Sequence, residues 1–172
     1  PKYLNTPETP LYKKSQVLYG VDLARKEISR RQQAVIVEGY TDVMAAHLSG
    51  IETAVATCGT AFGVDHIKVL RRLLMDQDEF RGQVIFTFDG DAAGRKAALR
   101  AFNEDQRFVS QTFVAIEKTG LDPCELRLQQ GPEVVRELVA RRTPLFEFVI
   151  RATLDDYDLN TAEGRVAGLR AV

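Results

Sequence analysis

The chain of 172 residues has 23 Lys and Arg, 24 Asp and Glu, a net charge of −1 and 45 % hydrophobic residues, a composition typical of a soluble globular protein with one sizeable core. It has no apolar run that could span a bilayer and no signal-peptide pattern, which excludes an integral membrane protein and predicts no membrane partner. Cys58 and Cys124 lack CxxC spacing, so neither a zinc ribbon nor a disulfide framework is indicated, and we expect a reducing, cytoplasmic location.

The N-terminal part of the chain begins with Pro1 and holds three prolines in residues 1–14. These prolines predict an extended surface segment. Apolar spacing in residues 16–31 predicts a helix. Residues 1–33 carry seven basic groups against three acidic ones. This excess predicts a basic face, although a solvated helix surface shows the same pattern.

Strand and helix signals alternate through the middle of the chain. The predicted strands and helices are, in order, strand 34–37, helix 42–49, strand 53–57, helix 65–75, strand 84–88, helix 92–102 and strand 112–116. This alternation indicates βαβ units with a mostly parallel sheet of four strands, flanked by helices.

The pattern changes to helices alone towards the C-terminus. Gly131-Pro132 and Thr143-Pro144 predict two helix starts, and Thr161 predicts a third. We therefore expect an α/β fold in three parts: a short basic N-terminal segment (1–33), the sheet domain (34–128) and a C-terminal helical bundle (129–172). Because the chain begins with Pro1, we also expect it to be part of a longer protein.

Acidic residues follow three of the four predicted strands. Glu38 follows the first, Asp89 and Asp91 follow the third, and Asp122 lies in the turn after the fourth. Because the carboxyl ends of parallel strands meet at one edge, we expect these side chains to converge. Carboxylates at such short distances repel one another unless a cation lies between them. Oxygen ligands of this kind suit Mg²⁺ or Mn²⁺. The alternative for Asp89 and Asp91 is that they cap the next helix.

Four motifs on these strand ends follow one another in the order found in Toprim domains. They are VEGYTDV at 37–43, TCGTA at 57–61, FDGDAAG at 88–94 and LDP at 121–123. The leader KYLNTPET at 2–9 resembles the segment that precedes the Toprim unit in DnaG-type bacterial primases. The chain as a whole resembles the catalytic core of those enzymes. This resemblance implies a DNA primase, which makes short RNA primers on single-stranded DNA by divalent-metal-dependent nucleotidyl transfer.

The resemblance also implies roles for individual acids. Glu38, Asp89 and Asp91 are the expected catalytic residues, and together with Asp122 they form the expected Mg²⁺ or Mn²⁺ site. Asp42 matches an acidic position at the rim. Glu38 is either a metal ligand or the base that takes the proton of the 3′-hydroxyl.

Two further features follow from the comparison with the family pattern. Cys124 stands where many relatives carry Asp, so the site either has one carboxylate fewer or uses Glu125 in part. The residues expected to contact template or nucleotide are Lys2, Asn5, Lys14, Gly59 and Arg95.

The expected partners are single-stranded DNA, NTPs and the RNA–DNA primer. The resemblance places helicase contact and zinc in domains absent from this chain, and we expect a monomer. His47 and His66 lie inside predicted helices with no partner at ligand spacing and are expected to be structural. The alternatives are another Toprim enzyme that cleaves phosphodiester bonds, or a non-catalytic nucleic-acid-binding module. A haloacid-dehalogenase-like phosphatase fits poorly, because Ala92 follows the second aspartate.

Overall fold

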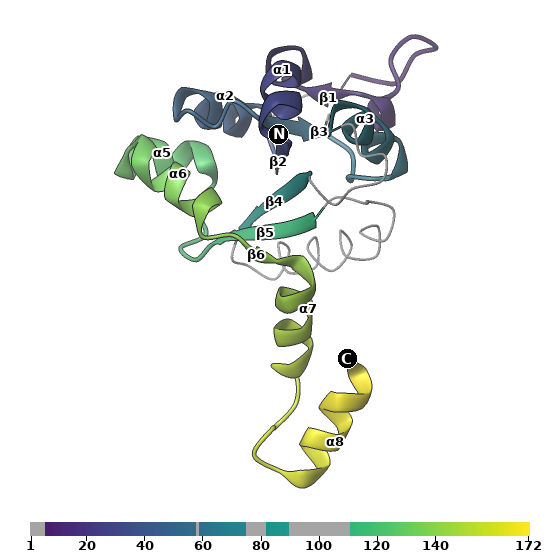
Figure 1. Ribbon diagram of the computed structural model, residues 1–172, viewed down its shortest axis with the longest axis vertical. Helices are drawn as coiled ribbons and strands as arrows, with labels where there is room; N and C mark the ends of the chain where they lie inside the picture. Colours follow the sequence, from purple (N-terminus) through teal and green to yellow (C-terminus); the bar gives the residue numbers. More distant parts are fainter. Residues whose placement is uncertain (1–5, 58, 75–81, 90–110) are drawn as a thin grey trace.

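A six-stranded mixed sheet forms the centre of the computed structural model, which describes residues 6–57, 59–74, 82–89 and 111–172, with Asp89 described by its backbone only. The strand order is β1-β3-β2-β4-β5-β6 (Figure 1). The strands are β1 (Leu18–Tyr19), β2 (Gln33–Val37), β3 (Ala54–Thr57), β4 (Gln83–Asp89), β5 (Gln111–Glu117) and β6 (Thr143–Pro144). The four predicted strands are β2 to β5, and all pairings among them are parallel. The α/β prediction is confirmed.

Helices connect and cover these strands. The described helices are η1 (Lys14–Gln16, a 3₁₀ turn), α1 (Val21–Arg31), α2 (Tyr40–Leu48), α3 (Val64–Leu74), α5 (Pro123–Gln130), α6 (Pro132–Ala140), α7 (Leu145–Leu154) and α8 (Ala162–Ala171). The predicted helix 92–102 lies outside the described residues. The sequence prediction missed α5, a helix that starts directly after Asp122.

The prediction of one helix over residues 16–31 is wrong in its first third. Leu18 and Tyr19 form β1, which pairs antiparallel with the end of β3. Gly20 follows with φ of +80°, and a Cβ atom there would lie 2.8 Å from Val43 Cγ1. A residue with positive φ cannot continue a helix, so α1 begins only at Val21.

The predicted all-helical tail also needs a correction. Thr143 and Pro144 form the short edge strand β6, which pairs antiparallel with Phe113 and Val114 of β5. A proline is tolerated at such an edge position because a sheet edge leaves one side of the strand unpaired. The predicted helix after Pro144 is confirmed as α7.

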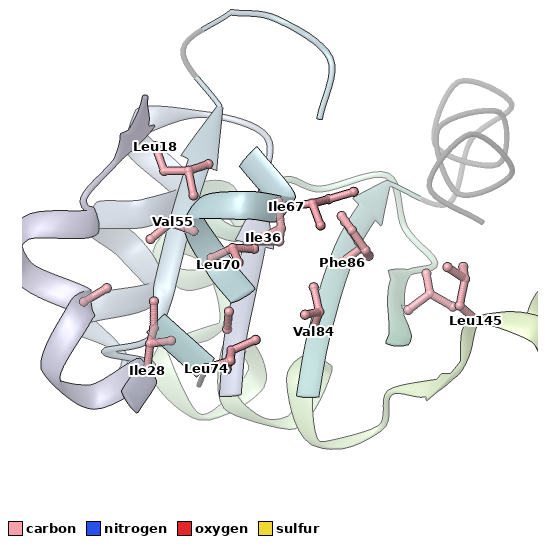
Figure 2. Close-up of a cluster of buried hydrophobic side chains, with 13 residues drawn as sticks. Leu18, Ile28, Ile36, Val55, Ile67, Leu70, Leu74, Val84, Phe86 and Leu145 are labelled. Carbon is pink, nitrogen blue, oxygen red and sulfur yellow. The ribbon is translucent and has the colours of Figure 1, made fainter. Parts of the chain in front are cut away.

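The core lies on both faces of the sheet, because side chains alternate along each strand. On one face Ile36, Val84 and Phe86 pack against Ile67, Leu70 and Leu74 of α3 (Figure 2). The side chains on the other face, together with α2, α5 and α6, form a second cluster. Its fully buried members include Val35, Ala54, Ala56 and Ile85. This two-sided burial matches the continuous apolar runs of parallel strands.

Helices α7 and α8 form an arm that leads away from the sheet (Figure 1). Its base is fixed by Leu145, which is fully buried in the cluster on the α3 face. Further out the arm exposes apolar side chains, including Phe146, Val166 and Leu169. Within the described residues, no helix is both long and apolar enough to cross a bilayer.

Candidate active site at the carboxyl edge of the sheet

The carboxyl ends of β2, β4 and β5 lie side by side at one edge of the sheet. Asp89, the last residue of β4, is paired in register with Glu117, the last residue of β5. Ile36 of β2 is paired with Phe86 of β4, and continuing that register places Glu38 beside Phe88. The fold therefore gathers acidic positions from three strands, as the sequence predicts.

A cavity of about 260 Å³ opens at this edge. Four acidic residues line it: Glu38, Asp42, Glu117 and Asp122. Phe88 of β4 lines it as well. The structure thus brings three of the predicted site acids together, Glu38, Asp42 and Asp122, and adds Glu117.

Asp42 holds the turn that presents Glu38. Its side chain is 4 % exposed, and Oδ2 accepts a hydrogen bond of 2.9 Å from the Gly39 N–H. Gly39 precedes the first turn of α2, so this bond satisfies an N–H group that has no partner within the helix. The predicted rim acid is therefore a buried cap at the cavity wall, and it fixes the backbone directly after Glu38.

Asp122 is held at the start of α5. Its Oδ1 accepts a 2.7 Å hydrogen bond from the Glu125 N–H, and Pro123 occupies the first helical position. A carboxylate at a helix N-terminus is stabilised by the positive end of the helix dipole. Neither Cys124 nor Glu125 is among the residues that line the cavity, and Glu125 is exposed.

Glu117 is a cavity residue that the sequence analysis did not select. Its Oε2 accepts hydrogen bonds from Thr119 N (2.6 Å), Thr119 Oγ1 (2.8 Å) and Leu121 N (3.0 Å). Burial raises the pKa of Glu117, but the hydrogen bonds from the Thr119 hydroxyl and the neighbouring backbone N–H groups outweigh it, and the pKa lies below its ordinary value. Glu117 therefore braces the turn that leads to Asp122. Its position directly after a predicted strand, like that of Glu38, was the available signal.

Replacing Glu117 by glutamine is expected to destabilise the protein near neutral pH and to have little effect in strong acid. Because the folded pKa is lowered, the carboxylate stabilises the fold above its ordinary value near 4.5, and this contribution is lost as the pH falls through the folded value. Urea unfolding of wild type and Glu117→Gln between pH 3 and 7 measures the difference. A difference independent of pH would contradict this role for the carboxylate.

The donor chemistry of the cavity fits a hard divalent cation. The lining acids offer only oxygen atoms, which suit Mg²⁺ or Mn²⁺. Among residues whose side chains are described, no group of three or more His, Cys, Asp or Glu side chains is placed to hold a metal ion. The carboxylate of Asp89 and all of Asp91 lie outside that description. The described acids therefore supply part of a metal site at most.

The predicted contact residues Lys14 and Gly59 lie at the adjoining part of this edge. Leu18 is paired with Thr57 at the end of β3, so η1, just before β1, lies beyond that end. Gly59 follows β3, is exposed and has φ of +69°, a conformation open to glycine without strain. The predicted contacts Lys2, Asn5 and Arg95 lie outside the described residues.

Both histidines contact backbone carbonyl oxygens, which agrees with the structural role predicted for them. His47 Nε2 lies 2.9 Å from the Ala54 carbonyl oxygen and ties α2 to β3. His66 is 1 % exposed and lies in the first turn of α3. Burial lowers the pKa of His66, which favours a neutral ring at pH 7.

A family model identifies this arrangement. Residues 32–119 match the model of the Toprim domain, which is half of the chain and includes β2 to β5. The chain belongs to the Toprim family. The strand-edge acids Glu38, Asp42 and Glu117 all fall inside the match, and Asp122 lies three residues beyond it.

The relatives that this Toprim domain resembles are DnaG-type primases. The chain is 64 % identical over 169 residues to a DNA primase of Streptomyces coelicolor, covering 98 % of the chain and 26 % of the relative. Its structure is similar to the RNA polymerase domain of Mycobacterium tuberculosis DnaG, with a TM-score of 0.87, 59 % identity and coverage of 98 % and 52 %. It is also similar to the same domain in complex with a double-stranded DNA oligomer with a 6-nucleotide overhang (TM-score 0.84, 61 % identity, coverage 99 % and 53 %).

Two further family models match the ends of this Toprim protein. Residues 1–25 match the N-terminal domain of the DNA primase catalytic core. Residues 146–172, which include most of α7 and all of α8, match the DnaB-helicase binding domain of primase. We expected helicase contact only through a domain absent from the chain, and this match instead places a related segment inside it. The chain spans about a quarter of the curated relatives it matches and about half of the solved domains.

Proposed function

We propose that the chain carries the metal-binding half of a DNA primase active site and takes part in nucleotidyl transfer from NTPs to a primer on single-stranded DNA. The observation that carries this proposal is the cavity at the carboxyl edge of a Toprim sheet, lined by Glu38, Glu117 and Asp122. Its DNA primase relatives support this reaction over phosphodiester cleavage by another Toprim enzyme. A non-catalytic binding module gives no reason for acids at three strand ends.

The proposed site has two kinds of residue: acids that would bind a cation, and residues whose hydrogen bonds keep those acids in position. Glu38, Asp89, Asp91 and Asp122 would hold Mg²⁺ or Mn²⁺. When bound, the cation would neutralise the charge of the triphosphate and of the attacking 3′-oxygen. Asp42 fixes the turn after Glu38, and Glu117 fixes the turn before Asp122. The acids are thus pre-positioned by hydrogen bonds, which reduces the reorganisation needed during reaction.

Glu38 keeps two proposed roles, as ligand or as general base. We favour the ligand role, because a nearby cation would lower its pKa and make it a weak base. Both roles require Glu38 to be exposed to the cavity, and its side chain is exposed.

The proposed partners follow from the same relatives. Single-stranded template, NTPs and the growing primer would pass the edge that carries Lys14 and Gly59. The arm formed by α7 and α8 would contact the replicative helicase, since residues 146–172 match the helicase-binding model and expose Val166 and Leu169. Such a role in replication would be carried out in the bacterial cytoplasm. The chain alone would make little primer, because it covers about half of the solved catalytic domains.

Metal titration tests the proposal directly. We expect the chain to bind Mn²⁺, and Asp89→Ala or Asp91→Ala to abolish this binding, because each removes an oxygen ligand from a site of few carboxylates. Isothermal titration calorimetry of each variant gives the affinity. Glu163→Gln, which changes an exposed acid on α8, serves as the control and should bind like wild type. Equal affinity in wild type and both aspartate variants would refute the metal site.

A further inference from the structure

His66 makes one hydrogen bond with each of its ring nitrogens. The Gly63 N–H donates to Nδ1 at 3.2 Å, and Nε2 lies 3.0 Å from the Lys14 carbonyl oxygen. A nitrogen that accepts from an N–H group carries no proton, so in the neutral ring the proton is on Nε2, which donates to Lys14. His66 therefore joins the start of α3 to the first residue of η1, 52 residues earlier in the chain.

The same ring completes the first turn of α3. Gly63 precedes Val64, the first residue of the helix, and the Gly63 N–H has no partner within the helix. The third helical residue accepts this hydrogen bond, as Glu or Gln does in a capping box. One side chain thus fixes both the helix start and the carbonyl group of Lys14.

Other contacts of the residues around η1 are more exposed. The Lys14 N–H donates to Glu8 Oε1 at 2.8 Å, a contact within the N-terminal segment itself. Ser15 Oγ donates to Asp65 Oδ2 at 3.4 Å, a longer hydrogen bond at an exposed position. The hydrogen bond of the buried His66 ring is partly shielded from water, whereas the other two hydrogen bonds are exposed, so it is the best protected of the three.

Aromatic contacts fix His66 relative to the candidate site. Its ring stacks on Phe62 with centroids 5.5 Å apart. Phe62 packs edge-on against Phe86 at 5.1 Å, and Phe86 stacks with Phe88 at 5.9 Å. Phe88 lines the cavity. The ring that holds Lys14 is therefore linked through Phe62 to β4, the strand that ends in Asp89.

We infer that His66 is a positioning residue that anchors Lys14 beside the carboxyl edge of the sheet, where Lys14 would contact the phosphates of template or NTP. This inference rests on the proposed function, because the placement of Lys14 matters only if nucleic acid passes this edge. It assigns a defined task to a buried side chain that the nucleotidyl transfer itself does not use.

Two substitutions separate the two hydrogen bonds of His66. His66→Gln keeps an N–H donor near the position of Nε2, whereas the shorter His66→Asn can place its carbonyl acceptor near Nδ1 but has no group that reaches the position of Nε2. We expect the Asn variant to weaken binding of fluorescein-labelled single-stranded DNA about fivefold, as Lys14→Ala does, and the Gln variant to bind within about twofold of wild type. His47→Gln is the matched control, since it removes an imidazole bound to a backbone carbonyl elsewhere.

A double-mutant cycle decides whether His66 acts through Lys14. His66→Asn should add no further loss of DNA binding in a Lys14→Ala background. Exchange of the amide protons of Gln16, the last residue of η1, and of Val17, which follows it, should accelerate in the Asn variant and not in the Gln variant when followed by NMR. Additive losses, no effect of either single substitution on DNA binding, or unchanged exchange would each overturn the inference. Mn²⁺ affinity should stay unchanged in His66→Asn, which separates this test from that of the metal site.

Discussion

Glu38→Gln is expected to slow primer synthesis about a thousandfold in a primase that contains this chain, equivalent to about 4 kcal/mol of barrier. Glutamine has nearly the shape of glutamate but no charge, so the cavity loses one negative oxygen donor while the turn held by Asp42 remains. The measurement is the single-turnover rate of primer extension at saturating Mg²⁺. A rate within tenfold of wild type would show that Glu38 is outside the reacting site.

Metal affinity measured on the same variant separates the two roles of Glu38. A ligand role predicts that the rate and the Mn²⁺ affinity fall together. A general-base role predicts a lower rate at unchanged affinity. Glu125→Gln is the matched control, because it removes the same charge three residues after Asp122 from an exposed side chain outside the cavity. Loss of rate in this control would instead support the idea that Glu125 substitutes for the family aspartate at position 124.

Ile85→Ala is expected to lower the free energy of unfolding by about 3 kcal/mol. Ile85 is fully buried at the middle of β4, between Val35 of β2 and Phe113 of β5. Removing its three outer carbon atoms leaves a cavity. The backbone cannot move in to fill this cavity, because β4 is hydrogen-bonded to a neighbouring strand on each side. For a chain of this size the loss corresponds to a fall in Tm of about 10 °C.

Two matched substitutions check the cause. Ile85→Val removes a single carbon and should cost about 1 kcal/mol. Leu11→Ala changes a side chain that is 99 % exposed and should cost less than about 0.5 kcal/mol. Chemical unfolding monitored by circular dichroism gives all three values. A stability of Ile85→Ala equal to wild type would contradict the packing of this face of the sheet.

Much of the fold was predictable because local signals agreed with the global arrangement. The runs at β2, β3, β4 and β5 are short and apolar, and each is followed by a helix signal or a turn, so parallel pairing was expected and is confirmed. The buried face of α3 was predictable as well, from the spacing of Ile67, Leu70 and Leu74.

The two edge strands were not predictable from local signals. β1 and β6 have two residues each, and in the sequence neither pair can be told apart from a turn or the start of a helix. They are strands because β3 and β5 offer them unpaired backbone groups. Gly20 delays the start of the predicted N-terminal helix to Val21, and a side chain at this position is excluded by the close contact with Val43 of α2, a residue distant in the sequence.

The candidate site also has a part that the sequence predicts and a part that depends on the tertiary structure. Side-chain type and strand position were enough to select Glu38 and Asp122, since parallel strands bring their carboxyl ends to one edge. The tasks of Asp42, Glu117 and His66 depend on hydrogen bonds whose partners are set by turns and by a contact 52 residues apart. Residue type and spacing were thus enough to predict which acids form the site. Which residues hold those acids in place depends on distances and angles that exist only after the chain has packed.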